Sequence, residues 1–364
     1  LALIKQNRGE EIDLDTIPLD DKTTFELFSQ GQTVGVFQFE SAGMQDYLKK
    51  LQPNSINDLV AMNALYRPGP MNMIGDFISR KHGKQRIDYL HPSLEAILRE
   101  TYGIIVYQEQ VIKITSEIAG FTLARADLMR RAMGKKDKSL MAELKKEFVA
   151  GATQKGIHRK LAAEIFDLIE KFASYGFNKS HSVAYSIIAY QTAYLKAHYP
   201  AEIMAAILTS EIGNTDKIVL LINDCRKNGI HVLPPDVNEG ASTFVVSRDG
   251  IRFGLSAVKN VGGNAVESIV RERERGGPFE TLFDFCRRVD LRVVNRKTIE
   301  SLIQAGAFDT LDRNRARLFE GLDKALSYAQ NYQAHAIRGQ SSLFDYSPIQ
   351  RTSPMTPTFP EVAE

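Results

Sequence analysis

The sequence predicts a mainly α-helical protein with a few short strands and one β-hairpin. Three observations predict this class. Long stretches such as KSLMAELKKEFVAGATQKG and KLAAEIFDLIEKFASYG are amphipathic at helical spacing and end at a glycine. Runs rich in β-branched and aromatic residues are short and rare. One pair of such runs, within TFVVSRDGIRFGL, is joined by Asp249-Gly250, which is typical of a hairpin turn.

The elements are expected in the following order. A helix in SAGMQDYLKKL should begin at Ser41, whose hydroxyl can cap the first turn, and SINDLVAMNALY should form a helix that stops at RPGP. Short strands are expected in TVGVFQFE and GIIVYQEQ. HSVAYSIIAYQTAYLKAHYP ends before Pro200 and has small and aromatic residues on most sides, which predicts a buried central helix. AEIMAAILTSEIG and DKIVLLINDCRKNG should follow as a helical pair.

A boundary is expected in LPPDVNEG, near residues 233–240, where proline and glycine are concentrated. The hairpin follows, and then a helical section from about Ala257 to Ala334. The last stretch, YSPIQRTSPMTPTFPEVAE, has the composition of a linker. The chain begins LALIKQNRGEE, without an initiator methionine, and is therefore expected to be a piece of a longer protein.

Composition and charge narrow the class of protein. The hydrophobic fraction of 43% and charged fraction of 25% are those of a soluble globular protein, and no apolar run reaches membrane-spanning length. Cys225 and Cys286 have no metal-ligand spacing, which fits a reducing cytoplasm. Residues 1–60 carry five Lys/Arg against ten Asp/Glu, whereas residues 121–190 carry thirteen against seven. This asymmetry indicates either a surface that faces a polyanion or a solvated basic face.

The first basic motif is LMRRAMGKKDK. Arg130 and Arg131 are adjacent on a predicted helix and diverge by about a hundred degrees, so their guanidinium groups can reach different oxygens of one triphosphate. Lys135 and Lys136 follow at a glycine. The alternative is a basic turn that faces solvent.

The second motif is YGFNKSHSVAYS, at the head of the predicted central helix. Asn178, Lys179, Ser180 and His181 can all donate hydrogen bonds where a helix start also offers free backbone N–H groups. This combination suits an anion, above all phosphate, and Tyr175 could support a base or sugar. The alternative is an N-cap at Ser180 beside a solvated Lys179.

The third motif is LSAVKNVGGNAVESIV. Lys259 and Val261-Gly262-Gly263 precede a predicted helix, in a pattern that resembles the hairpin of a helix-hairpin-helix module. In such hairpins glycine N–H groups at a helix start bind DNA phosphate without reading sequence. NRKTIESLIQAGAFDTL could form a second helical pair. The pattern is not unique, because many helix turns contain two glycines.

Two further patterns are weaker. Gln340, Leu343 and Phe344 form a Q-x-x-L-F peptide in a polar tail, where an exposed Leu-Phe pair is costly unless it docks on a partner. Asp13 and Asp15 would share one face of a strand and could hold paired Mg²⁺ ions. Their acidic, proline-containing context, EEIDLDTIPLDD, instead favours a solvated loop.

Taken together, FQFESAGM, ALYRPGP, YGIIVYQEQV, RRAMGKK, YGFNKSHSVAY and LKAHYPAEIMAA occur in an order that resembles the bacterial DNA polymerase III alpha subunits, the C family of replicative polymerases. The resemblance covers nearly the whole chain up to the tail. It implies a multi-helix fingers domain, then a β-hairpin with a tandem helix-hairpin-helix region, then a peptide that binds the sliding clamp. The predicted regions are a connector (1–40), the fingers (41–235), the helix-hairpin-helix region (236–335) and a linker (336–364).

The resemblance also implies roles for the motif residues. The implied nucleotide-binding residues are Arg130, Arg131, Tyr175, Asn178, Lys179 and His181. The implied DNA-binding residues are Lys135, Lys136, Lys259, Val261, Gly262 and Gly263, and the implied clamp-binding residues are Gln340, Leu343 and Phe344. Arg130 and Arg131 would grip the phosphates of the incoming deoxynucleoside triphosphate. Lys179 with its neighbours would add donors, and Tyr175 would lie against the sugar or base.

One departure from the family concerns catalysis. The family's three palm aspartates, two of them in a Pro-Asp-Phe-Asp type motif, have no counterpart in this sequence. The resemblance therefore implies that Mg²⁺ is held by a palm outside this chain, that the chain contains no catalytic residue, and that it does not extend a primer alone. Asp13 and Asp15 do not match the catalytic motif.

The expected partners are template-primer DNA, deoxynucleoside triphosphate, the sliding clamp and other replicase subunits, in the bacterial cytoplasm and not at a membrane. One alternative is a non-catalytic helix-hairpin-helix scaffold that binds DNA. It leaves Arg130-Arg131 and the order of the motifs unexplained. Another is a complete nucleotide-using enzyme with metal-binding acids at Asp13 and Asp15, which Mg²⁺-dependent activity of the chain would reveal.

Overall fold

The computed structural model describes residues 1–135, 137–173, 175–337 and 359. Two compact units make up the chain: Asp13–His198 forms one, and Leu1–Ile12 together with Tyr199–Glu364 forms the other. The boundaries of these two units therefore differ from the boundaries of the four regions predicted from the sequence. The four regions are defined by function, and they stay predictions.

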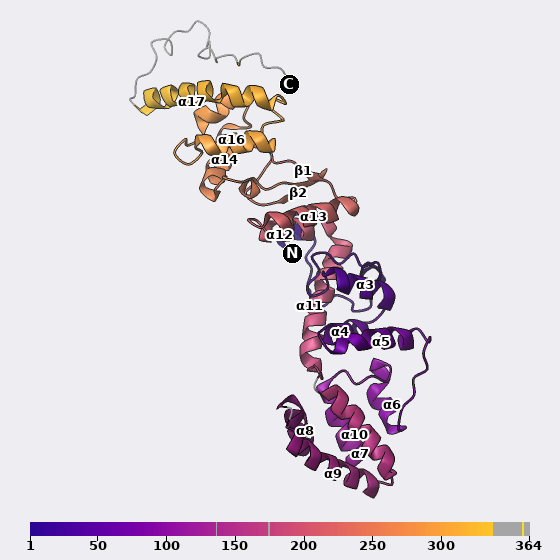
Figure 1. The fold of residues 1–364 in the computed structure, drawn as a ribbon. Coiled ribbons are helices and arrows are strands. Elements are labelled where there is room, and N and C mark those ends of the chain that lie inside the picture. The colour runs from indigo at the N-terminus through magenta and orange to yellow at the C-terminus, as the bar shows by residue number, and fades with distance from the viewer. Residues whose placement is uncertain (136, 174, 338–358, 360–364) are drawn as a thin grey trace. The chain divides into compact units, whose positions relative to one another are not determined.

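The described chain is mainly helical, with one small sheet, as the sequence predicts (Figure 1). The helices of the unit Asp13–His198 are α2 (Lys22–Ser29), α3 (Ala42–Leu51), α4 (Ile56–Leu65), α5 (Ile74–Lys81), α6 (Ser93–Leu98), α7 (Gln108–Ala119), α8 (Leu123–Lys135), α9 (Lys138–Gln154), α10 (Arg159–Ala173) and α11 (Lys179–His198), with short 3₁₀ turns at Pro70–Met73 and Arg99–Thr101. The other unit contains α1 (Ala2–Arg8), α12 (Pro200–Ser210), α13 (Thr215–Lys227), β1 (Val232–Leu233), β2 (Val245–Ser247), β3 (Gly250–Arg252), a 3₁₀ turn at Leu255–Ala257, α14 (Gly263–Gly276), α15 (Leu282–Arg288), α16 (Arg296–Ala305) and α17 (Arg315–Ile337).

In the unit Asp13–His198, α8, α9 and α10 pack with α7 around one apolar core (Figure 1). The amphipathic stretches predicted as helices form α9 and α10, and their apolar faces, which include Phe148 and Phe166, are buried there. The predicted central helix is α11, which packs on α4 and α2 and buries small residues and Tyr190. These contacts fix the start of α11 against the rest of the unit.

The helix starts show which cap predictions are right. Ser41 caps α3, as predicted, because its hydroxyl accepts a hydrogen bond from the Met44 N–H at 3.3 Å. The alternative cap at Ser180 is wrong. The side chain of Asn178 accepts from the His181 N–H at 2.8 Å, so α11 begins one residue after Asn178.

Neither predicted short strand forms. TVGVFQFE folds into successive turns, in which Gly35 and Gln38 have positive φ and Phe39 is buried. GIIVYQEQ contributes only an isolated bridge, between Tyr107 and Phe177, before α7 begins. Most of the β-branched and aromatic residues in both stretches are buried, although Phe37 is exposed, so burial rather than strand pairing explains most of the composition.

The predicted hairpin is confirmed as β2 and β3, which pair antiparallel, with β1 parallel on the other side of β3. Ser247 pairs with Gly250, so Arg248 and Asp249 form the turn instead of the predicted Asp249-Gly250 pair. Gly250 is required for a different reason. Its φ is 142°, and a Cβ there would lie 2.3 Å from the carbonyl oxygen of His231, the residue before β1.

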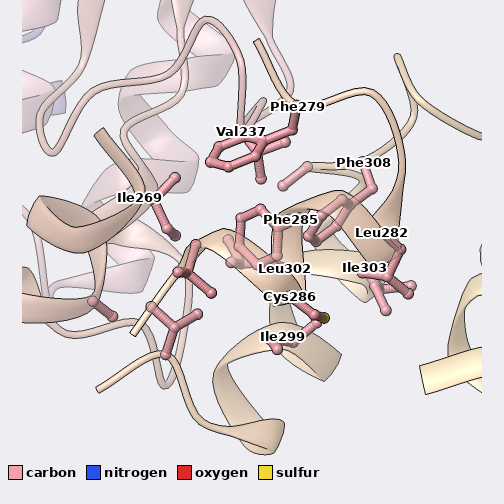
Figure 2. Close-up of a cluster of buried hydrophobic side chains, with 14 of the residues drawn as sticks. Val237, Ile269, Phe279, Leu282, Phe285, Cys286, Ile299, Leu302, Ile303 and Phe308 are labelled. Atoms are coloured by element: carbon pink, nitrogen blue, oxygen red, sulfur yellow. The ribbon is translucent and has the colours of Figure 1, made fainter. Parts of the chain in front are cut away.

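Helices α14 to α17 enclose a second core, which Figure 2 shows. Phe285 of α15 lies edge-on to Phe308, with ring centroids 4.9 Å apart. Cys286 is buried in this core, and burial raises the pKa of its thiol to about 12. Among the residues that the structure describes, no helix is long and apolar enough to cross a membrane.

Candidate functional site

The start of α11 is fixed by contacts to distant parts of its unit. Ser182 donates a hydrogen bond to the Val60 carbonyl of α4 at 2.7 Å. Phe177 is held on the strand-like segment before α7, because its N–H donates to the Val106 carbonyl and its own carbonyl accepts from Gln108. The predicted phosphate-binding stretch is therefore tied to α4 and to the segment before α7 by hydrogen bonds.

Lys179 lies between two carboxylates. Its ammonium is 2.6 Å from the Glu100 carboxylate and lies 5.4 Å from the centroid of the Tyr107 ring, with about a third of the side chain exposed. Its backbone N–H donates to Glu109 of α7 at 2.9 Å, and the Asn178 amide donates to the other oxygen of Glu109 at 3.1 Å. The helix start thus already binds an anion, which is the carboxylate of Glu109.

His181 and Tyr175 lie on either side of this cluster along the chain. The His181 ring stacks at 4.2 Å from Tyr185 and 5.4 Å from Phe177, so its side chain belongs to an aromatic row at the surface. The Tyr175 ring is 44% exposed and rests on Gly69, where a Cβ would be 2.3 Å from the ring. Gly69 has a φ of 101°, so both the close approach and the backbone require glycine.

Arg67 is a residue of this site that the motif analysis did not identify. Its guanidinium donates to the Tyr175 carbonyl at 2.9 Å and lies 4.3 Å from the centroid of the Phe177 ring. Burial lowers the pKa of Arg67. In the sequence it stands in RPGP, where only the helix stop was evident. Its contact with the stretch more than a hundred residues later depends on the tertiary fold.

Arg130 and Arg131 lie on α8 and share one carboxylate. Asp127, one turn earlier, is 2.8 Å from each guanidinium, and the Arg130 hydrogen bond lowers the pKa of Asp127. Ala126 and Met129 on the same helix are buried, Arg130 at the edge of this buried face is partly exposed, and Arg131 is exposed. Arg125 of the same helix instead pairs with Glu143 and Glu147 of α9.

The two predicted phosphate-binding groups share a scaffold but do not touch. No hydrogen bond, ion pair or ring contact within the described part of the chain joins Arg130 or Arg131 to Asn178, Lys179 or His181. Both groups are nevertheless supported by α7, because α8 packs on α7 and α7 carries Glu109. Lys135 ends α8, and Lys136 lies outside the described residues, as do Gln340, Leu343 and Phe344.

The predicted DNA-binding hairpin lies at the start of α14. Gly262 and Gly263 are exposed, and a Cβ at either would have no atom within 4 Å. Within the described residues, the Gly263 and Asn264 N–H groups donate no hydrogen bond, as expected for the first turn of a helix without a side-chain cap. Lys259 is exposed nearby in the sequence. Val261 differs, because its side chain is buried and its N–H bonds to the Val258 carbonyl.

The second helical pair has its own arrangement. NRKTIESLIQAGAFDTL contains α16, whose C-cap is Gly306 in the left-handed backbone conformation. The chain then continues to α17. Asn295 caps α16, and its oxygen accepts from the Thr298 N–H at 3.1 Å. Both helices pack on the same apolar core as α14. The two helical pairs therefore share one hydrophobic core (Figure 2).

The acidic residues of the first segment do not fit a metal site. Asp13 and Asp15 are exposed in a turn, in which the Asp13 carboxylate accepts from the Asp15 N–H at 3.0 Å. This turn is the solvated loop that the sequence context favours. Among the described residues, no group of three or more His, Cys, Asp or Glu side chains could hold a metal ion.

Comparison with known proteins gives two matching family models. The model described as the bacterial DNA polymerase III alpha subunit finger domain matches residues 1–156, and a helix-hairpin-helix motif model matches residues 229–318. The first match begins inside the stretch predicted as a connector.

The chain is also similar to proteins described as DNA polymerase III subunit alpha. It is 49% identical to that of Pasteurella multocida over 96% of this chain, 50% to that of Borreliella burgdorferi over 93%, and 47% to that of Escherichia coli K12 over 94%. It spans 31%, 30% and 31% of their lengths. The two family models, matched in order on a sequence that is about half identical to these subunits, show that the chain belongs to the bacterial DNA polymerase III alpha subunit family.

Proposed function

We propose that this chain contributes the nucleotide-binding fingers and a DNA-binding region to a replicative DNA-directed DNA polymerase. The observation that carries the proposal is the placement of the basic groups. Lys179 at the start of α11 and Arg130 with Arg131 on α8 are presented from one compact unit, and both groups are supported by α7. Together they offer three cations to a polyanion such as a triphosphate.

Each of these cations has a carboxylate partner that a phosphate oxygen can replace. Asp127 pairs with both arginines, and Glu100 pairs with the Lys179 ammonium. An arriving triphosphate would exchange carboxylate oxygens for phosphate oxygens, so the cations keep a negative partner before and after binding. The exchange is easy because these pairs are partly exposed, so solvent screens the attraction between the charges.

In the proposed reaction the same cations neutralise the negative charge that grows on the leaving pyrophosphate. The arginines are suited to this role because each guanidinium can hold two oxygens at once. Tyr175, which is exposed beside Gly69, would support the sugar or base, and the hydrogen bond from Arg67 to its carbonyl would hold its backbone. Nucleotidyl transfer also uses Mg²⁺, which we propose is held by a palm outside this chain.

The DNA-binding part of the proposal rests on the start of α14. The exposed Gly262-Gly263 backbone and the exposed Lys259 suit a DNA phosphate, in agreement with the helix-hairpin-helix match. Val261 would act through packing, since its side chain is buried. Contacts of Lys135 and Lys136 with DNA, clamp binding through Gln340, Leu343 and Phe344, binding of other replicase subunits and a cytoplasmic location stay predictions. A non-catalytic DNA-binding scaffold would account for α14 but not for the basic groups on α8 and α11.

Steady-state kinetics of a full-length polymerase that contains this sequence test the proposal. Arg130→Ala and Arg131→Ala should raise the KM for nucleotide, lower kcat, or both, and at least one should lower kcat. Arg130→Lys should restore activity only in part, because an ammonium keeps the charge and loses the fork. Arg125→Ala is the matched control on the same helix, and its nucleotide kinetics should stay close to those of the parent. Loss of DNA affinity with unchanged nucleotide kinetics would indicate that Arg130 and Arg131 contact the DNA and not the nucleotide.

A further inference from the structure

A notch on α17 is filled by an aromatic side chain from the far end of the chain. Phe359 lies so close to Gly321 that a Cβ at Gly321 would be 2.1 Å from the Phe359 ring. On its other side the Phe359 ring lies 4.8 Å from the centroid of Phe283 on α15, tilted by 44°. Phe283 in turn meets Tyr328 of α17 edge-on at 5.9 Å. Phe359 thus packs, half-buried, against the core of α14 to α17.

The notch exists because α17 has a glycine in its interior. Glycine in the middle of a helix is less favourable than alanine by about 0.5–1 kcal/mol, since it gains backbone freedom in the unfolded chain. Gly321 lies in the first half of the 23-residue helix, between the buried Leu318 and Leu322, and its φ is not positive. Its backbone therefore does not need glycine. The close approach of the Phe359 ring does need it, because any side chain would occupy the same space.

We propose that Gly321, Phe283 and Tyr328 form a docking site for Phe359, which anchors the C-terminal segment of the chain on α17. The geometry makes the return possible. Sixteen residues of α17 separate Gly321 from Ile337, a rise of about 24 Å. The chain from Ile337 to Phe359 can span up to about 73 Å, which is more than this distance.

The docking claim does not depend on the proposed polymerase function, and it can be tested by fluorescence. The chain contains no tryptophan, so Phe359→Trp introduces a single reporter. Quenching by acrylamide should be several-fold weaker for this variant than for Phe359→Trp combined with Gly321→Ala, in which the new methyl group fills the notch. Gly75→Ala is the matched control, because Gly75 lies in α5 with no atom within 4 Å of its Cβ position. It should leave the quenching unchanged.

Hydrogen exchange of the chain without tryptophan is a second test, which applies even if the larger indole ring does not fit the notch. Phe359→Ala and Gly321→Ala should each speed the exchange of the α15 backbone about tenfold, because both remove the ring that covers Phe283. Far-UV circular dichroism should show α17 intact in Gly321→Ala, since alanine favours the helix. Unchanged exchange of α15 in both variants would overturn the proposal.

Discussion

Replacing Asp58 by alanine tests how the fold supports the start of α11. Asp58 of α4 and Lys81 of α5 form an ion pair at 2.6 Å, with side chains only 3% and 7% exposed. Asp58 also accepts from the Asn54 N–H at 3.0 Å, while Lys81 donates to the Asn54 side chain at 3.1 Å. Loss of one partner leaves the other charge buried, which typically destabilises by about 3–5 kcal/mol. Because Lys81 can still donate to Asn54 in the variant, we expect a destabilisation at the lower end of this range.

Native-state hydrogen exchange of α4 measures this effect within one compact unit. A loss of about 3–5 kcal/mol should speed the slowest α4 amides by roughly two to four orders of magnitude. Asp46→Ala is the control, because Asp46 and Lys49 form an exposed pair at 3.9 Å that contributes at most about 1 kcal/mol. The reasoning is refuted if Asp58→Ala speeds exchange no more than Asp46→Ala does.

Three further predictions follow from the charges and the tail. Asp290 has its pKa lowered to about 2 by the side-chain and backbone hydrogen bonds of Arg292, so it stabilises the fold above its unfolded pKa near 3.8. That contribution is lost as pH falls from 4 toward 2, and urea unfolding should show a weaker acid dependence for Asp290→Asn. Leu343→Ala with Phe344→Ala should lower processivity on clamp-loaded DNA and leave clamp-free synthesis nearly unchanged; equal clamp-dependent processivity in parent and variant would count against this role. The chain alone should bind DNA weakly, lose affinity steeply with added salt, and not extend a primer; extension abolished by Asp13→Ala would place the active site in this chain.

Local signals in the sequence predict the helices well and the strands poorly. The cap at Ser41, the amphipathic faces of α9 and α10 and the hairpin of β2 and β3 all follow from short-range patterns. TVGVFQFE and GIIVYQEQ have strand-like composition, but each lacks a neighbouring strand long enough to pair with it. Most of their apolar residues are instead buried without strand pairing, and only tertiary structure decides between these outcomes.

In the candidate site, too, the sequence predicts contacts between residues that are close along the chain but not contacts between distant residues. Residue type and spacing identified Arg130, Arg131 and Lys179. Asp127 could also have been found, since positions three and four residues apart on a helix are neighbours. Glu100 lies 79 residues from Lys179 in the sequence, and no local pattern predicts its contact with that ammonium.

Chemical modification of arginine in a full-length polymerase that contains this sequence can show whether Arg130 and Arg131 bind the incoming nucleotide. The reagent is an arginine-selective dicarbonyl, and the rate at each arginine is followed by mass spectrometry with primer-template DNA, with and without the correct deoxynucleoside triphosphate. We expect nucleotide to slow modification of Arg130 and Arg131, while Arg125, paired with Glu143 and Glu147, reacts at the same rate in both samples. Protection of Arg130 and Arg131 by DNA alone, with no further effect of nucleotide, would contradict it.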